Sequence, residues 1–229
     1  MTNLYHNNRI SIQVGLSGYS FKVYAEGELS HSSGWMQADR IFTTTQFQKR
    51  YEQVCISVFT PKAALIPSQF FAPERARLLL DDVVDLSDGD HVEYIPIPEL
   101  ASVLIYSNTI GESLSKVISQ TVLNSDGTHA RLLPEMYYML GHLSSLTEYN
   151  KILASYMDGV LYLVIAQGKS LLLCNTYKAP DFTTAQYFIF LAMKRLQLNP
   201  EVSTIAFRTP LAEDEEMSLY RYFKSVEQI

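Results

Sequence analysis

A segment that occurs twice constrains this chain more than any other feature of its sequence. Residues 17–32 read SGYSFKVYAEGELSHS, residues 158–173 read DGVLYLVIAQGKSLLL, and the two align without a gap. Each copy has the pattern of a glycine turn, a strand, a second glycine turn and another strand. A further strand-like run precedes each copy, at residues 9–14 and 151–156. We therefore expect each half of the chain to open with three antiparallel strands joined by tight turns.

The segments after each strand triplet also correspond. In the second half, Asp181 or Thr183 can cap a helix with one apolar face, and a proline at position 200 stops it before the next strand. In the first half we expect a helix at residues 44–53 and a strand at residues 54–59. Three strands, a helix and a strand, used twice, indicate a duplicated α/β fold.

The first half carries additional segments. Residues 62–71, 91–98 and 101–108 contain strand-like runs, and Pro73 suits the first turn of a short helix. We therefore expect a first lobe at residues 1–146 with an insertion at about 62–98, and a second lobe at residues 147–229.

Three further helices are predicted from local patterns. The spacing of Thr109 and Glu112 is that of a capping box, and an apolar helical face follows it. Residues 134–146 have an amphipathic pattern. The acidic run that begins at Glu213 suits the start of a last helix, which we expect to run to Ile229.

The tripeptide Gly168-Lys169-Ser170 is the end of a phosphate-binding P-loop motif, which requires another glycine five residues before Gly168. That position is Leu163, and apolar runs flank the tripeptide on both sides. This pattern favours a hairpin turn between two strands over a nucleotide-binding loop.

Charge and composition exclude several classes of protein. The chain has 229 residues and a net charge of −6, and no cluster of lysine and arginine is longer than a pair, which argues against nucleic acid or an anionic membrane as the main partner. No apolar run is long enough to span a membrane, and the first residues lack the pattern of a secretory signal. We therefore expect a cytoplasmic protein. Cys55 and Cys174 lie in apolar runs and are expected to be reduced thiols, with a disulfide between them as the less favoured alternative.

Other candidate chemistry is weak. The acidic residues between 81 and 90 do not occupy the ligand positions of a calcium-binding EF-hand and are interpreted as a solvated loop. The five histidines have no metal-ligand spacing, so no metal site is predicted. The tyrosine pair at 137–138, together with Tyr220 and Tyr222, indicates either an interaction surface or half-buried helix faces.

The strand triplets RISIQVGLSGYSFKV and SYMDGVLYLVIAQGKSLLLCNTY, with ALIPSQFF and TAQYFIFLAMKRLQLNPE, resemble the actin-like ATPase superfamily, which includes actin and the sugar kinases. More narrowly, the chain resembles an uncharacterised bacterial family, a domain of unknown function, with that fold. The ALIPSQFF segment is also similar to the pilus and cell-division members, which are peripheral adaptors. The resemblance covers nearly the whole chain and implies two lobes of ribonuclease H-like fold, with a nucleotide bound between them.

The resemblance also implies where nucleotide contacts would lie, and this chain departs from each motif. Gln13 stands where an aspartate would position magnesium, although Gly15 follows as expected, and Ser17 lies in the same turn. Asp158 and Gly159 begin the second phosphate motif, but a valine and a leucine replace its further glycines. Arg208 follows the late strand where a glycine pair would hold the adenosine.

Three eroded motifs favour a non-catalytic cytosolic protein that acts through interaction with another protein and has no cofactor. The alternative is a nucleotide-binding ATPase or kinase-like protein that binds ATP with magnesium through altered contacts, lined by Gln13, Gly15, Ser17, Asp158, Gly159 and Arg208. A third hypothesis is a structural adaptor that forms homodimers through edge strands or tyrosine-bearing helices.

Overall fold

The computed structural model describes residues 8–109 and 112–229, and the chain divides into two compact units. Unit 1 consists of residues 1–60, 87–91 and 107–135. Unit 2 consists of residues 61–86, 92–106 and 136–229. The lobe limits expected from the sequence stay a prediction, because compactness alone does not define where a lobe begins.

Unit 1 is built on a mixed sheet in which β1 pairs antiparallel with β2 and parallel with β5. The strand order is β3-β2-β1-β5-β9, and β4 pairs with β2. The expected strand triplet is therefore confirmed. The strands are β1 (Arg9–Val14), β2 (Gly18–Ala25), β3 (Glu28–Ser32), β4 (Met36–Gln37), β5 (Gln53–Val58) and β9 (Leu132–Pro134).

One face of this sheet is apolar because hydrophobic residues alternate along its strands. Ile10 and Ile12 of β1 are 0% exposed and pack with Ile118 of α2 (Glu112–Thr121). Polar residues, among them Gln13, occupy the alternate positions of β1. The capping box predicted from Thr109 and Glu112 spans residues 110 and 111, which lie outside the described residues, so it stays a prediction.

The prediction of a helix at residues 44–53 is wrong. The chain instead forms two 3-10 helices, η1 (Ala38–Thr43) and η2 (Thr45–Gln48), with extended backbone at Thr44 between them. The hydroxyl groups of Thr43 and Thr44 both donate to the carbonyl of Arg40. Threonine side chains that bond to nearby backbone compete with α-helix formation, which accounts for the short tight turns.

The helix expected at residues 134–146 is shorter than predicted. Pro134 ends β9, which pairs parallel with β5, and α3 runs from Glu135 to His142. After α3, the hydroxyl of Ser144 donates to the carbonyl of Gly141, and that of Ser145 to the carbonyl of His142. These hydroxyls satisfy carbonyl groups that a longer helix would have used.

Unit 2 contains a second sheet with the order β12-β11-β10-β13-β14, in which β10 pairs antiparallel with β11 and parallel with β13. Gly168, with φ of 55°, lies in the turn between β11 and β12, so the tripeptide that resembles a P-loop is a hairpin turn. The strands are β10 (Asn150–Met157), β11 (Val160–Gln167), β12 (Ser170–Lys178), β13 (Thr204–Phe207) and β14 (Ser225–Gln228).

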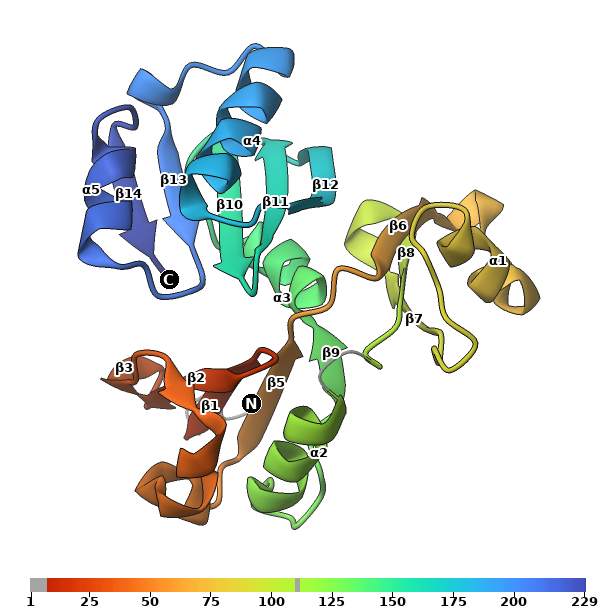
Figure 1. Ribbon diagram of the computed structural model, residues 1–229, viewed down its shortest axis with the longest axis vertical. Coiled ribbons are helices and arrows are strands. Elements are labelled where there is room, and N and C mark those ends of the chain that lie inside the picture. Colours follow the sequence, from red (N-terminus) through yellow and green to blue (C-terminus); the bar gives the residue numbers. More distant parts are fainter. Residues whose placement is uncertain (1–7, 110–111) are drawn as a thin grey trace, which may run out of the picture. The chain divides into compact units, whose positions relative to one another are not determined.

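Two helices cover one face of this sheet (Figure 1). The first is α4 (Phe182–Arg195), whose predicted cap is confirmed because the Asp181 carboxylate accepts from the backbone N–H of Thr184. That hydrogen bond lowers the pKa of Asp181. The second is α5 (Glu213–Tyr220), which ends well before the expected limit at Ile229. The chain then forms β14, because parallel pairing with β13 satisfies its backbone groups.

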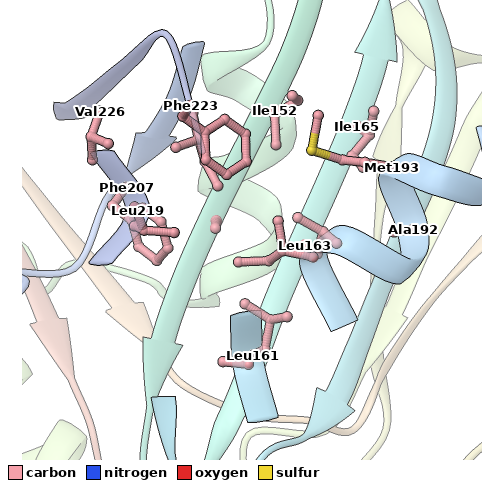
Figure 2. Packing of buried hydrophobic residues seen from close by; sticks show 14 of the residues in the cluster. Ile152, Leu161, Leu163, Ile165, Ala192, Met193, Phe207, Leu219, Phe223 and Val226 are labelled. Atoms are coloured by element: carbon pink, nitrogen blue, oxygen red, sulfur yellow. The ribbon is translucent and has the colours of Figure 1, made fainter. Parts of the chain in front are cut away.

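The α4–α5 side of the sheet contains a large apolar cluster of unit 2 (Figure 2). Leu161, Leu163 and Ile165 of β11 are each 0% exposed and lie against the buried residues of α4, Ala192 and Met193 among them. Leu153, Tyr162 and Val164, at the alternate strand positions, are also buried. A sheet that is buried on both faces requires nearly continuous apolar strands, which this sequence has.

The segment inserted into the first half forms a small antiparallel sheet of order β6-β8-β7 in unit 2. Its strands are β6 (Ala63–Pro67), β7 (Glu93–Ile97) and β8 (Ser102–Tyr106), as the sequence predicted. The helix α1 (Ala76–Asp81) packs on it through Leu80, and Pro73 lies in the 3-10 turn η4 (Pro73–Arg75) that leads into α1.

The two larger sheets have the same strand order and the same strand directions. This agreement confirms the strand pattern in both halves, whereas an origin by duplication stays a prediction. No helix within residues 8–109 and 112–229 combines the length and the apolar character needed to cross a membrane.

Leu163 tests the packing of unit 2. We expect Leu163→Ala to lower the free energy of unfolding by about 2–5 kcal/mol, because it leaves a cavity at a fully buried site. Urea denaturation would measure the change. Leu172→Ala is the matched control, since Leu172 lies in the neighbouring strand and is 37% exposed. Equal losses in the two variants would contradict the buried position of Leu163.

Cys174 predicts a dependence of stability on pH. Neither cysteine forms a disulfide. Although Cys174 as a residue is partly exposed, burial raises the pKa of its thiol from 9.0 to about 12. The unfolded chain therefore loses this proton first, so the contribution of the thiol is present below pH 9 and is lost as pH rises toward 12. Between about pH 8.5 and 10, wild type should lose about 1 kcal/mol more stability than Cys174→Ala. Parallel losses would contradict a buried thiol.

Candidate functional site

A buried polar cluster joins β1, β2, β5 and the first residue of α3 in unit 1. The side-chain amide of Gln13 donates from Nε2 to Oε1 of Glu135 at 3.1 Å. Its Oε1 accepts from the Ser20 hydroxyl at 3.3 Å, and the Ser57 hydroxyl donates to Oε2 of Glu135. Glu135 is 0% exposed and Gln13 only 6%, so both are enclosed by protein.

This cluster is chemically self-consistent. A buried carboxylate requires donors, and Gln13 and Ser57 each supply one to a different oxygen of Glu135. The amide of Gln13 is used at both ends, because its oxygen also accepts from Ser20. Gln13 therefore connects strands and a helix start within the protein.

No local sequence pattern identifies Glu135 as a partner of Gln13, since the two residues are 122 positions apart. The available signal was an acidic residue in the first turn of a helix, where a carboxylate is stabilised by the helix dipole. That signal predicts a helix start but does not identify its neighbour.

The loop after β1 holds the other predicted residues of unit 1. Gly15 is buried and its N–H donates to the carbonyl of Gly18 at 3.0 Å, which closes the turn. Ser17 is exposed, and its carbonyl accepts from the N–H of Ala38 at 3.3 Å. A β-carbon on Gly18 would lie 2.2 Å from the carbonyl oxygen of Met36, so this glycine is required for the close approach of β4.

Asp158 and Gly159 form a tight hairpin turn in unit 2. Their φ angles are 51° and 72°, and the flanking residues Met157 and Val160 are directly paired. Positive φ at both central residues is typical of a two-residue turn that suits the twist of the strands. The carbonyl of Gly159 accepts from the N–H of Ala179 at 2.8 Å. At the aligned position in unit 1, Gly18 is required for packing, whereas Gly159 has a backbone conformation that favours glycine.

Arg208 lies at the same edge of this sheet as Asp158, because β10 and β13 are parallel neighbours and both end there. Its N–H donates to the carbonyl of Ala154 at 3.0 Å. The guanidinium lies 5.5 Å from the ring centre of Tyr138, and the residue is 6% exposed. A buried arginine over an aromatic ring contributes to packing between β13 and α3.

The structure thus groups Gln13, Gly15 and Ser17 in unit 1, and Asp158, Gly159 and Arg208 in unit 2. The expectation that these groups line one nucleotide site stays a prediction.

A second buried acidic group, the carboxylate of Asp90, was not identified from the sequence. Asp90 belongs to the acidic stretch that was interpreted as a solvated loop, but it is 5% exposed. Its carboxylate accepts from the Ser107 hydroxyl at 3.1 Å and from the N–H of Ser87 at 2.7 Å. The carbonyl of Ser107 in turn accepts from the Thr60 hydroxyl at 2.6 Å. These bonds fasten three separate chain segments of unit 1, while Asp85 and Asp88 of the same stretch are exposed.

The residues present do not fit a magnesium nucleotide held as the superfamily resemblance implies. An amide stands at the position of the metal-positioning carboxylate, and this amide is bonded within the protein. The second motif is a two-residue turn without further glycines. Within the described part of the chain, no three His, Cys, Asp or Glu side chains lie together as metal ligands.

Comparison with known proteins supports the fold. The model of a family described as "Protein of unknown function (DUF3822)" matches residues 3–226. No curated protein shows significant similarity to the sequence. A Bacteroides thetaiotaomicron protein "with actin-like ATPase fold and unknown function" is 18% identical, with a TM-score of 0.68 over 100% of this chain and 94% of that chain.

Two other solved structures have the same fold at low identity. The PilM–PilN type IV pilus biogenesis complex contains a chain 12% identical, with a TM-score of 0.56 over 97% of this chain and 88% of that one. The cytoplasmic domain of EpsL from the type II secretion system of Vibrio cholerae is also 12% identical, with a TM-score of 0.52 over 90% and 83% of the two chains. These likenesses confirm an actin-like α/β fold and carry no residue-level function.

The polar cluster predicts a specific loss of stability. We expect Gln13→Met to lower the free energy of unfolding by about 1–3 kcal/mol, because the buried Glu135 loses a donor. Gln53→Met is the control, since Gln53 is an exposed residue of β5 in the same sheet and should change stability by less than about 0.5 kcal/mol. Urea denaturation of both variants would show whether the cost belongs to the cluster.

Proposed function

This chain belongs to the family described as protein of unknown function (DUF3822) and has the actin-like ATPase fold; from that premise we propose that it is an interaction scaffold rather than an ATPase. Such a scaffold would act in the cytoplasm by binding another protein. The support comes from the structural contacts that the residues at the motif positions make within the chain.

The observation that carries the proposal is the use of Gln13. Its amide nitrogen and oxygen are both bonded to buried groups of unit 1, so the side chain stabilises β1, β2 and the start of α3. A residue that positions hydrated magnesium needs an accessible negative charge, and Gln13 has neither the charge nor the exposure.

The turn at Asp158 supports the same conclusion. A glycine-rich loop binds phosphate because several successive N–H groups can approach it closely. Here the hairpin closes after two residues, and Val160 is already paired with Met157. The turn therefore suits a rigid strand connection better than a phosphate cradle.

Proteins of the same fold occur within larger assemblies. One solved relative is a complex of PilM with PilN, and another is the cytoplasmic domain of an inner membrane component of a secretion system. Those printed descriptions apply to those proteins, and they support the proposal only by showing that this fold can serve in assemblies.

The second candidate function is nucleotide binding through altered contacts, with ATP and magnesium as the ligand. It is favoured by the loop from Gly15 to Ser17, which keeps the motif glycine and exposes Ser17. Asp158, Gly159 and Arg208 would then supply the contacts from unit 2.

A thermal-shift measurement separates the two candidates. A ligand at about 100 times its Kd stabilises a protein by about 2.7 kcal/mol. For a chain of this size that corresponds to a rise of roughly 5–10 °C in Tm. We expect no rise with millimolar ATP, ADP or GTP plus magnesium, and no release of phosphate.

Asp158→Ala tests the predicted contact from unit 2. Asp88→Ala is its control, because Asp88 is an exposed carboxylate outside the predicted site residues. A rise in wild type that is lost in Asp158→Ala but kept in Asp88→Ala would overturn the scaffold proposal and make nucleotide binding the function.

A further inference from the structure

Helices α4 and α5 lie side by side and run in the same direction. The Gln186 amide of α4 donates to the Ser218 hydroxyl of α5. Four residues further along both segments, the rings of Phe190 and Tyr222 meet with centroids 5.0 Å apart. Equal steps along both segments mean that the amino ends of the two helices lie at one end of this surface and their carboxyl ends at the other.

The outer surface of this helix pair, which we call the α4–α5 face, has an exposed apolar centre. Tyr187 of α4 is 60% exposed and Met217 of α5 is 58% exposed, and Tyr222, which follows Arg221 just after the end of α5, is 52% exposed. The inward positions of the same helices, such as Ile189 and Leu219, are fully buried. Large side chains gathered on an exposed helix surface are typical of an interaction site.

Charged residues flank this centre with opposite sign at its two ends. Asp181, Glu213 and Asp214 are exposed at the amino ends of the helices. The carboxyl ends carry exposed cations, which are Lys194, Arg195, Arg221 and Lys224. Asp214 and Met217 of α5 and its C-cap residue Arg221 follow one another at spacings of three and four residues and so share one side.

We propose that the α4–α5 face binds a second copy of this chain about a two-fold axis, with the helices of the two protomers antiparallel. A two-fold rotation places the acidic end of one protomer on the basic end of its partner at both ends of the contact. It also places the aromatic centre on itself. This dimer rests on the proposed scaffold function, and it makes a second copy of the chain the partner that the α4–α5 face binds.

The charge pattern favours a second copy over an unrelated protein because the surface is complementary to itself at both ends. Asp214 and Arg221 are seven positions apart, which corresponds to about 10 Å along a helix. This distance is similar to the Debye length of about 8–10 Å at physiological salt, so the two ends act as separate charges. Each end therefore attracts its opposite on the partner.

Sedimentation equilibrium of the full chain tests the contact. We expect a dimer with a micromolar or lower Kd, and the double variant Tyr187→Ser with Tyr222→Ser should raise that Kd by at least about 30-fold. Tyr149→Ser is the control, because Tyr149 is 71% exposed in unit 2 but lies on neither helix, and it should leave Kd unchanged. Circular dichroism melts of all variants would confirm that they fold.

A charge exchange tests the orientation. The variant Glu213→Lys with Asp214→Lys makes both ends basic. The variant Lys194→Glu with Arg195→Glu and Arg221→Glu leaves Lys224 as the one cation of that set and makes both ends acidic. Each variant alone should be monomeric because like charges then meet twice. An equimolar mixture of the two should form a heterodimer, since every contact is again between opposite charges.

Several outcomes would overturn the proposal. A wild-type chain that stays monomeric at about 100 μM, where a micromolar dimer is almost fully formed, excludes the dimer. A dimer that survives the tyrosine variant, or a mixture of charge variants that stays monomeric, excludes this face. None of these results bears on nucleotide binding, so failure of the dimer and failure of the scaffold proposal are distinguished by the thermal-shift result.

Discussion

Parallel pairing next to an antiparallel hairpin is the constraint on which both larger sheets depend. In unit 1, β1 pairs parallel with β5, and in unit 2, β10 pairs parallel with β13. Parallel neighbours cannot be joined by a tight turn, so the chain must cross over and cover a sheet face on the way. In unit 2 that crossover contains α4, and its apolar side completes the cluster around Leu163. The same pairing brings the carboxyl ends of β10 and β13 to one edge, which explains why Asp158 and Arg208 share it.

The second constraint is that each buried carboxylate must have hydrogen-bond donors. Glu135 is fully enclosed, and the free energy of burying a carboxylate is tolerable only with donors in place. Gln13 and Ser57 provide them from two parallel strands. Asp90 is satisfied in the same way by Ser107 and a backbone N–H. Gln13 therefore contributes to the folding of unit 1 through its cluster with Glu135.

The α4–α5 face shows how local stability and surface chemistry can arise from the same residues. Acidic residues near helix amino ends and basic residues near carboxyl ends are each favoured by the helix dipole. Because α4 and α5 are parallel, these preferences add up to a surface with one acidic and one basic end. The dipole does not explain the exposed Tyr187 and Met217 between those ends, since their exposure brings no benefit to an isolated helix.

The sequence by itself determined the features that depend on near neighbours. The strand triplets, the turns at Asp158–Gly159 and Gly168, and the cap of α4 by Asp181 follow from alternation, turn residues and capping, which act within a few residues. Tertiary structure decided the rest. The short strands β9 and β14 carry weak patterns and exist because β5 and β13 offer parallel partners. The partnership of Gln13 with Glu135, and the parallel arrangement of α4 with α5, join residues far apart in the chain. No local rule contains those contacts, because folding alone brings the groups within hydrogen-bonding or packing distance.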